Sequence, residues 1–174
     1  MQLVANSGFR GDTRVLLITR DEVDICDLGV GDELDDGFGS PVAVAGLCAS
    51  PLDARSFVML AGLPLTSEHP VWTVAGWQII DPPVSPPEAV TIEVLDFLVE
   101  TSLDTVDLPT IPILRSSSSL LVARGLSTRA AGPVSLLASS PEDVVYCPAL
   151  DGGGTFVANG YVVGGLRVIS REPM

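Results

Sequence analysis

Short apolar runs, broken by polar residues, glycine or proline, recur along the whole chain. They are rich in Val, Ile, Leu and Thr, and several alternate between apolar and polar positions, as half-buried β-strands do. The pattern predicts an all-β protein with strands at 13–18, 23–28, 41–48, 55–60, 90–94, 120–123, 133–138 and 144–147. The stretch 95–103 is ambiguous, because it fits either a continuation of the preceding strand or a short helix.

Turn residues predict two hairpins. Asn159-Gly160 separates the runs 155–158 and 161–163, and an Asn-Gly pair in such a place is the strongest short-range sign of a type I′ hairpin, because both residues tolerate positive φ. A second hairpin is expected where Ala75-Gly76 separates two short runs that each contain a tryptophan. The segment 81–87 holds four prolines, which lack the amide donors of strands and helices, so we expect a surface crossing within one domain.

Length and charge exclude several classes of protein. A chain of 174 residues suits one domain with its own core. Charged residues, prolines and glycines interrupt every apolar run well before the ~18 residues of a membrane span, and the first residues do not resemble a signal peptide. The 22 acidic residues outnumber the 9 basic ones, which argues against nucleic acid or an anionic membrane as partner, since both require clustered Lys and Arg.

The cysteines and the acidic pairs give no sign of a metal site or cofactor. Cys26, Cys48 and Cys147 are odd in number and far apart, and they are expected to be free thiols in a reducing, cytoplasm-like compartment or in a piece of a larger chain. Asp35-Asp36 and Glu142-Asp143 occupy predicted turns, where we expect solvated tips. Calcium binding is an alternative for these pairs, although no EF-hand pattern is present.

The only histidine of the chain, His69, is the clearest candidate for chemistry. A histidine can transfer protons near neutral pH. Thr66, three positions earlier, can place its hydroxyl in the same small volume if the segment turns between strands. Pro70 favours extended backbone at His69 and so limits the direction of the ring. This spacing fits either a proton-transfer site or a half-buried turn histidine capped by a threonine.

Four separated stretches resemble, in order, the sequence blocks of one family. Residues 8–17 resemble an opening block of the pattern Cys-Phe-x-Gly-Asp-Thr-x-Val, and 27–34 resemble a block of the pattern Asp-Leu-x-x-Gly-Asp-x-Val. Residues 66–70 are similar to a Thr-x-x-His block, and 145–163 to a closing block with a hairpin around Val-x-Asn-Gly. The chain resembles the Hint domains of hedgehog proteins and inteins over nearly its whole length, and most closely the Vint-type variant.

The resemblance implies a single compact Hint fold of curved antiparallel strands with pseudo-twofold symmetry, over residues 8–168. Residues 1–7 would be an upstream remnant and 169–174 a C-terminal tail. The opening and closing blocks should converge at Thr66 and His69. We expect a monomer, without cofactor or metal, that acts on its own polypeptide.

The family's chemistry is self-processing. A cysteine that opens the first block attacks the preceding carbonyl, and this N-to-S acyl shift turns the amide into a thioester. By its place in the motif, His69 would protonate the departing amine and bond the amide nitrogen, while Thr66 would support the peptide and orient the ring. Cys147 and Cys48 fall in strands that would border the site. Either could assist the chemistry as a second thiol or be a simple core residue. The implied activity is single-turnover self-cleavage at the N-terminal junction, with the acyl acceptor left open.

The chain departs from the family at both ends of this chemistry. Gly8 occupies the nucleophile position, and without a side chain it cannot begin the acyl shift, so the domain is expected to be inactive as written. Ser7, one residue earlier, carries a hydroxyl that offers a rescue of the acyl shift, but it lies out of register. At the far end, Gly164-Gly165 stands where an intein carries His-Asn, which excludes asparagine cyclisation and full splicing if the alignment holds.

Two accounts of Gly8 are open: a substitution that keeps a competent precursor intact, or a natural degenerate domain. The retained Thr66 and His69 favour the first. A non-catalytic β-rich interaction or structural module derived from a Hint fold is the alternative function. An ordinary metal or hydrolytic enzyme fits poorly, because one histidine cannot build a usual zinc site and no Gly-x-Ser-x-Gly is present.

Overall fold

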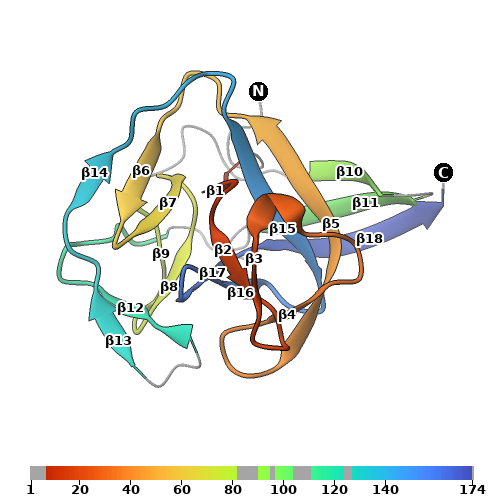
Figure 1. The fold of residues 1–174 in the computed structure, drawn as a ribbon, viewed down its shortest axis with the longest axis horizontal. Coiled ribbons are helices and arrows are strands. Elements are labelled where there is room, and N and C mark those ends of the chain that lie inside the picture. The colour runs from red at the N-terminus through yellow and green to blue at the C-terminus, as the bar shows by residue number, and fades with distance from the viewer. Residues whose placement is uncertain (1–6, 82–89, 95–96, 104–110, 124–126, 174) are drawn as a thin grey trace.

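The computed structural model describes residues 7–81, 90–94, 97–103, 111–123 and 127–173 (Figure 1). Within these residues the regular elements are strands, apart from the short 3-10 helix η1 (Ile25–Asp27). The predicted all-β class is therefore confirmed. The described residues include no helix that is long and apolar enough to cross a membrane.

The described strands form two sheets. The ten-stranded sheet contains β1 (Phe9–Arg10), β4 (Glu33–Asp35), β5 (Pro41–Pro51), β6 (Phe57–Leu60), β7 (Leu63–Thr66), β10 (Val90–Val94), β11 (Phe97–Leu103), β14 (Val134–Leu136), β15 (Val144–Asp151) and β18 (Leu166–Pro173). The eight-stranded sheet contains β2 (Arg14–Leu16), β3 (Glu22–Asp24), β8 (Val71–Thr73), β9 (Gly76–Gln78), β12 (Ser119–Leu121), β13 (Thr128–Ala130), β16 (Thr155–Ala158) and β17 (Tyr161–Gly164).

The strand order brings the two ends of the motif pattern together. In the first sheet β1 lies between β7 and β15, with Phe9 opposite both Leu65 and Tyr146. In the second, β17 lies between β8 and β16. The described strand pairs are antiparallel except β15–β18, which is parallel. Figure 1 shows β10, β11 and β18 extending together to one side of the molecule.

The Asn-Gly hairpin is confirmed. Strands β16 and β17 pair on either side of Asn159 and Gly160, whose φ angles are 47° and 88°. The tryptophan hairpin is also present, but its turn is one residue earlier than predicted: Thr73 pairs with Gly76, so Val74 and Ala75 form the turn. Gly76, with φ of 99°, begins β9 instead of ending the turn.

Other boundaries differ from the prediction. The strand expected at 23–28 ends at Asp24, because the chain then turns through η1 to bury Ile25. The ambiguous stretch forms strand β11. Strand β13 was not expected at all. The boundary expected at 168 falls inside β18. Apart from Asp81, the proline-rich crossing lies outside the described residues.

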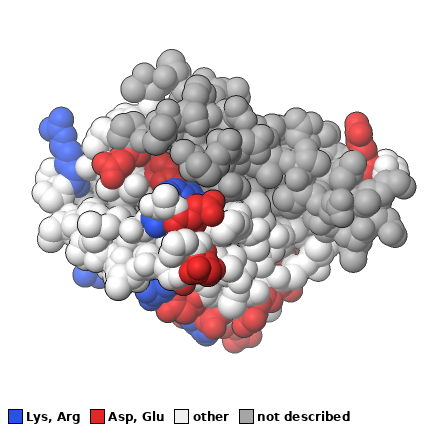
Figure 2. All heavy atoms as spheres, turned by 90° about the horizontal axis from the view of Figure 1, so that it is seen from above, with Lys and Arg blue, Asp and Glu red and all other residues white. Residues whose placement is uncertain are grey.

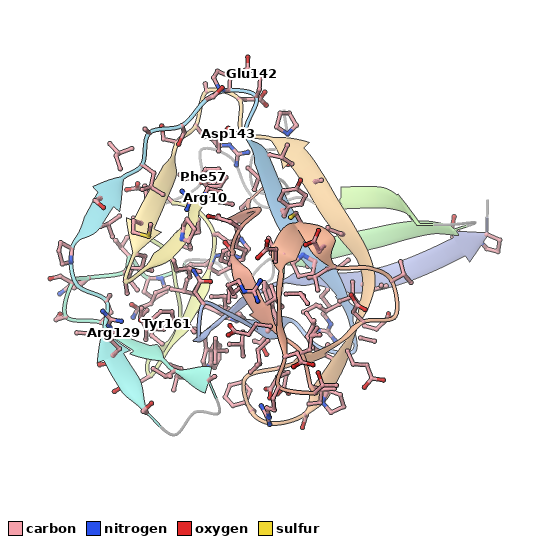
Figure 3. The ribbon with its side chains drawn as sticks, in the orientation of Figure 1. Arg10, Phe57, Arg129, Glu142, Asp143 and Tyr161 are labelled. Carbon is pink, nitrogen blue, oxygen red and sulfur yellow. The ribbon has the colours of Figure 1, made fainter. Side chains whose placement is uncertain are left out.

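The predicted acidic tips have different environments. Asp35 is fully buried, so the expected solvated tip is wrong there: its carboxylate accepts hydrogen bonds from Arg20, at 2.7 Å, and from the Gly37 amide, at 2.8 Å. Glu142 is exposed, and with Asp143 it lies in the turn before β15 (Figure 3). On the face seen in Figure 2, basic side chains near the centre and along the lower edge lie beside acidic ones, and another basic side chain projects from the upper left edge.

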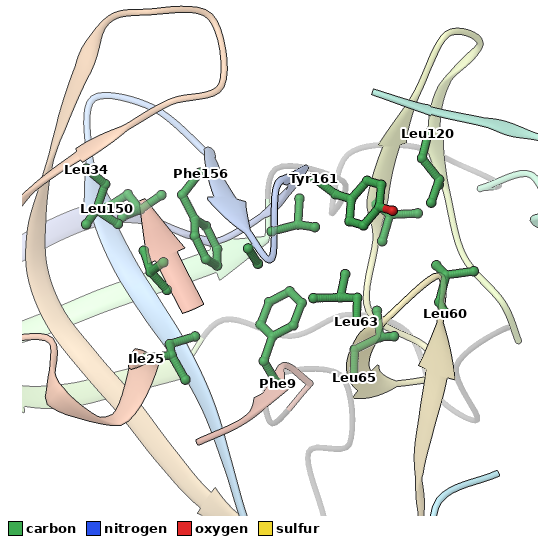
Figure 4. Close-up of a cluster of buried hydrophobic side chains, with 14 of the residues drawn as sticks. Phe9, Ile25, Leu34, Leu60, Leu63, Leu65, Leu120, Leu150, Phe156 and Tyr161 are labelled. Carbon is green, nitrogen blue, oxygen red and sulfur yellow. The ribbon is translucent and has the colours of Figure 1, made fainter. Parts of the chain in front are cut away.

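The core lies between the two sheets. Its largest fully buried side chains come from strands of both sheets and from η1; among them are Phe9, Ile25, Leu65, Leu150 and Phe156 (Figure 4). Phe9 and Phe156 make an edge-to-face contact with their centroids 5.7 Å apart. Burying each such side chain stabilises the fold by roughly 1.5–3 kcal/mol. This packing fixes β1, and with it the residues just before β1.

Candidate functional site

The Thr66–His69 segment forms a tight turn between β7 and β8. The His69 amide donates to the Thr66 carbonyl at 3.1 Å, which closes the turn. Glu68, in the middle of the turn, pairs with Arg55 at 2.6 Å, and both side chains are largely buried. A buried ion pair is specific in geometry even where its net stabilisation is small. It fixes the turn to the segment before β6.

The imidazole of His69 is fully buried, and both of its nitrogens have partners. Nε2 lies 2.6 Å from the carbonyl oxygen of Gly164, at the end of β17, and Nδ1 lies 2.8 Å from the Ser7 hydroxyl. The Phe9 ring packs edge-to-face on the imidazole, with centroids 4.6 Å apart. Burial lowers the pKa of His69 from 6.5 to about 4, and the Gly164 carbonyl offsets part of that effect. His69 is therefore neutral at neutral pH.

Thr66 holds the backbone of Gly8. The Gly8 amide donates to Thr66 Oγ1 at 3.0 Å, and the Thr66 amide donates to the Gly8 carbonyl at 2.9 Å. The contact expected between His69 and the amide of position 8 is thus made by Thr66, and His69 contacts the residue before it. Ser7, Gly8, Thr66 and His69 are all buried.

Position 8 is packed for glycine. A Cβ added to Gly8 would lie 2.3 Å from the backbone oxygen of Tyr146 and 3.2 Å from Cβ of Cys147. The first contact is with the backbone of β15, which cannot move aside as a flexible side chain can. Any larger residue at position 8 therefore requires β1 and β15 to separate.

The two candidate thiols lie on adjacent strands. Cys147 borders Gly8, as the Cβ contact shows, and it pairs in register with Cys48 across β15 and β5. Both are buried free cysteines, and burial raises the pKa of each thiol above its ordinary value. A protonated thiol is a poor nucleophile, so neither is activated in this arrangement.

The closing block reaches the site through backbone atoms. Gly164 supplies the carbonyl that accepts the hydrogen bond from His69 Nε2. A Cβ on Gly164 would lie 3.1 Å from Pro70, and one on Gly165 would lie 2.8 Å from Leu150. Both glycines fit closely packed surroundings, and the larger His-Asn pair of an intein would have to displace them. Beyond Gly165 the chain continues as β18.

Three parts of the site were not predicted from the sequence. These are the contact between Ser7 and His69, the pairing of Arg55 with Glu68, and the packing of Phe9 on the imidazole. The motif places Ser7 out of register as a substitute nucleophile, and no local spacing links it to a residue 62 positions away. A glutamate two residues after Thr66 was the one available sign of an ion pair, but its partner could not be read from the sequence.

The described residues give no metal centre at His69. The one group of potential ligands among them is Asp24, Cys26 and Asp27, and Asp24 is already paired with Arg14 at 2.8 Å. The chemistry of the site is instead that of a hydroxyl, a neutral imidazole and a carbonyl in series. Such a series can take up and return a proton.

Comparison with solved structures identifies the fold. The gp41-1 intein matches with a TM-score of 0.59 and 13% identity, over 91% of this chain and 98% of the intein. A DnaB intein from Synechocystis sp. PCC 6803 matches with a TM-score of 0.58 and 15% identity, over 91% and 98% of the two chains. An intein-like domain from Clostridium thermocellum matches with a TM-score of 0.60 and 16% identity, over 92% and 99%.

No protein-family model and no curated protein sequence matches the chain. The Vint subtype therefore stays a prediction, and the likeness rests on the fold. This chain has the Hint fold of inteins and bacterial intein-like domains.

Proposed function

We propose that this chain is a self-processing domain that acts on its own polypeptide at the segment leading into β1. The observation that carries the proposal is the convergence of that segment, the Thr66–His69 turn and the end of β17 on one buried imidazole. A module that only binds partners has no evident need to bury a neutral histidine against its own chain. The similarity to inteins supports the same function.

The family's thioester step at position 8 is lost in this proposal. Gly8 has no nucleophile, and the space beside it is filled by the backbone of Tyr146. The tight fit of glycine favours a natural departure from the family over a simple exchange of cysteine for glycine. The closing steps of splicing are lost as well, because Gly164 and Gly165 lack the side chains for them.

The proposal is tested with a small folded protein fused ahead of Met1 and with the variant Ser7→Cys. This variant keeps the Cβ of Ser7 and places a thiol beside His69 Nδ1, so a thioester can form and dithiothreitol can cleave it. We expect thiol-dependent release of the upstream protein, which intact-mass measurement monitors. The double variant Ser7→Cys/His69→Gln should lose this release.

The variant Gly8→Cys in the same fusion compares a nucleophile at position 8, the family position, with one at position 7. Release from Gly8→Cys but not from Ser7→Cys would return the nucleophile to the family position. If neither variant releases the upstream protein, although circular dichroism shows that both are folded, the self-processing function is wrong and the non-catalytic module stands.

A further inference from the structure

Ser7 is buried in a way that is unusual for serine. Its side chain is 2% exposed, although serine is mostly found at protein surfaces. The hydroxyl oxygen lies 2.8 Å from Nδ1 of His69. Serine at this position is outside the motif that resembles the family, so the contact comes from this chain's own structure.

The partners of His69 determine where its proton lies. The Gly164 carbonyl can only accept a hydrogen bond, so Nε2 must carry the hydrogen. In a neutral imidazole the other nitrogen is then bare, and Nδ1 accepts the proton of the Ser7 hydroxyl. The result is a hydroxyl, a base and a group that orients the base, which is the arrangement that activates serine nucleophiles.

The other nucleophile candidates do not contact the base. Thr66 Oγ1 accepts the Gly8 amide and lies within 3.5 Å of the Gly8 carbonyl, so its hydroxyl is engaged with that peptide. The buried thiols of Cys48 and Cys147 are held in their protonated form. Among the described residues, Ser7 is the one nucleophilic side chain with a hydrogen bond to His69.

We propose that Ser7 is the nucleophile of an N-to-O acyl shift that converts the peptide bond between Asn6 and Ser7 into an ester. This inference deepens the proposed function and rests on it. It moves the reacting bond one residue upstream of the position that the family motif marks.

The step balances within the chain. Ser7 Oγ forms a bond to the carbonyl carbon of Asn6 and gives its proton to His69 Nδ1. The bond between that carbon and the Ser7 nitrogen then breaks, and the imidazolium returns the proton to the departing amine. The product is an ester between Asn6 and Ser7 Oγ, with a free α-amine on Ser7. Water cleaves the ester to the acid of Asn6 and a chain that begins at Ser7, and hydroxylamine cleaves it to the hydroxamate of Asn6.

Gly8 gains a role in this arrangement. Both its amide and its carbonyl are bonded to Thr66, which fixes the peptide that follows Ser7. Its missing Cβ lets that peptide lie against the backbone of β15. A glycine at position 8 therefore suits a site in which the preceding residue reacts.

The test uses the unaltered serine in the fusion described above, with hydroxylamine at neutral pH and intact mass as the readout. We expect two fragments, one that ends in the Asn6 hydroxamate and one that begins at Ser7. Ser7→Ala should abolish them, and His69→Gln should slow their formation by about 100-fold or more, the usual contribution of a positioned base.

One competing reaction gives a similar cut and needs its own control. An asparagine side chain can cyclise onto its own carbonyl and release the next residue. Asn6→Ala removes that route but leaves the backbone carbonyl for Ser7, so cleavage should persist in Asn6→Ala. Cleavage that persists in Ser7→Ala, or disappears in Asn6→Ala, overturns the ester route.

The two proposals fail differently. If Ser7→Cys releases the upstream protein with dithiothreitol but the unaltered serine gives no hydroxylamine fragments, the ester route is wrong and the self-processing function stands. If Ser7→Cys and Gly8→Cys also both stay intact in folded chains, both proposals are wrong.

Discussion

One buried imidazole determines the character of the site at the scale of single residues. His69 is neutral because the surrounding core excludes water, and its two nitrogens differ because one faces a carbonyl and the other a hydroxyl. Neither property can be read from a Thr-x-x-His spacing. The spacing identified the residue, and the packing of Phe9, Ser7 and Gly164 decides what it can do.

His69 should make the stability of the fold depend on pH. Its pKa is about 4 when folded and 6.5 ordinarily, so the unfolded chain binds more protons between these values. The stabilisation that comes from keeping His69 neutral is complete above its pKa in the unfolded chain. It is lost as the pH falls toward its pKa in the folded chain. Lowering the pH from about 7.5 to about 5 should therefore decrease the free energy of unfolding by about 2 kcal/mol through His69 alone.

Urea unfolding at both pH values measures this cost. Carboxylates also titrate in this range, so the comparison is with His69→Gln, whose loss between the two pH values should be smaller by that amount. An equal loss in the two proteins would contradict a depressed pKa at His69.

The fit of Gly8 against β15 gives a second prediction at this scale. Gly8→Ala should destabilise the fold by about 2 kcal/mol or more, because the new Cβ meets a backbone oxygen and the strands must separate. Gly29→Ala is the matched control: its Cβ would have only the Asp32 carboxylate nearby, at 4.0 Å. Thermal unfolding of both variants measures the difference, and equal stabilities would show that position 8 has room.

At the scale of elements, local turn chemistry was predictable and long-range pairing was not. The Asn159-Gly160 hairpin follows from two residues that tolerate positive φ, and the structure confirms it. Strand β13 has three exposed residues and no apolar alternation, so no hydrophobic pattern predicts it. The local pattern predicts a solvated tip at Asp35, because it cannot reveal a partner such as Arg20, 15 residues away.

The β16–β17 turn should depend on the side chain of Asn159 as well as on its backbone. Its Oδ1 accepts the Arg14 amide at 2.8 Å, and its Nδ2 donates to the Gly62 carbonyl at 2.9 Å. Asn159→Gly tolerates the positive φ but loses these two hydrogen bonds. Asn159→Ala loses the same hydrogen bonds and also disfavours the positive φ. We expect Asn159→Ala to be less stable than Asn159→Gly by about 1 kcal/mol in urea unfolding. Equal values would mean that the backbone conformation contributes little.

At the scale of the whole molecule, the site exists only when both sheets are folded. Ser7 precedes β1, His69 follows β7, and Gly164 ends β17, so three distant segments must meet before the imidazole has its partners. The sequence blocks predicted that the opening and closing segments converge. The pairing of Ser7 with His69 could not be predicted, because it depends on how closely β1 packs between β7 and β15.

Nitrogen-15 NMR of the imidazole is the measurement that tests this account most directly. The chain has one histidine, so its two ring nitrogens need no assignment by mutation. We predict a neutral ring with its proton on Nε2 and a bare, hydrogen-bonded Nδ1, unchanged from neutral pH down to about pH 5. A ring that titrates at its ordinary pKa of about 6.5, or that carries its proton on Nδ1, would contradict the account.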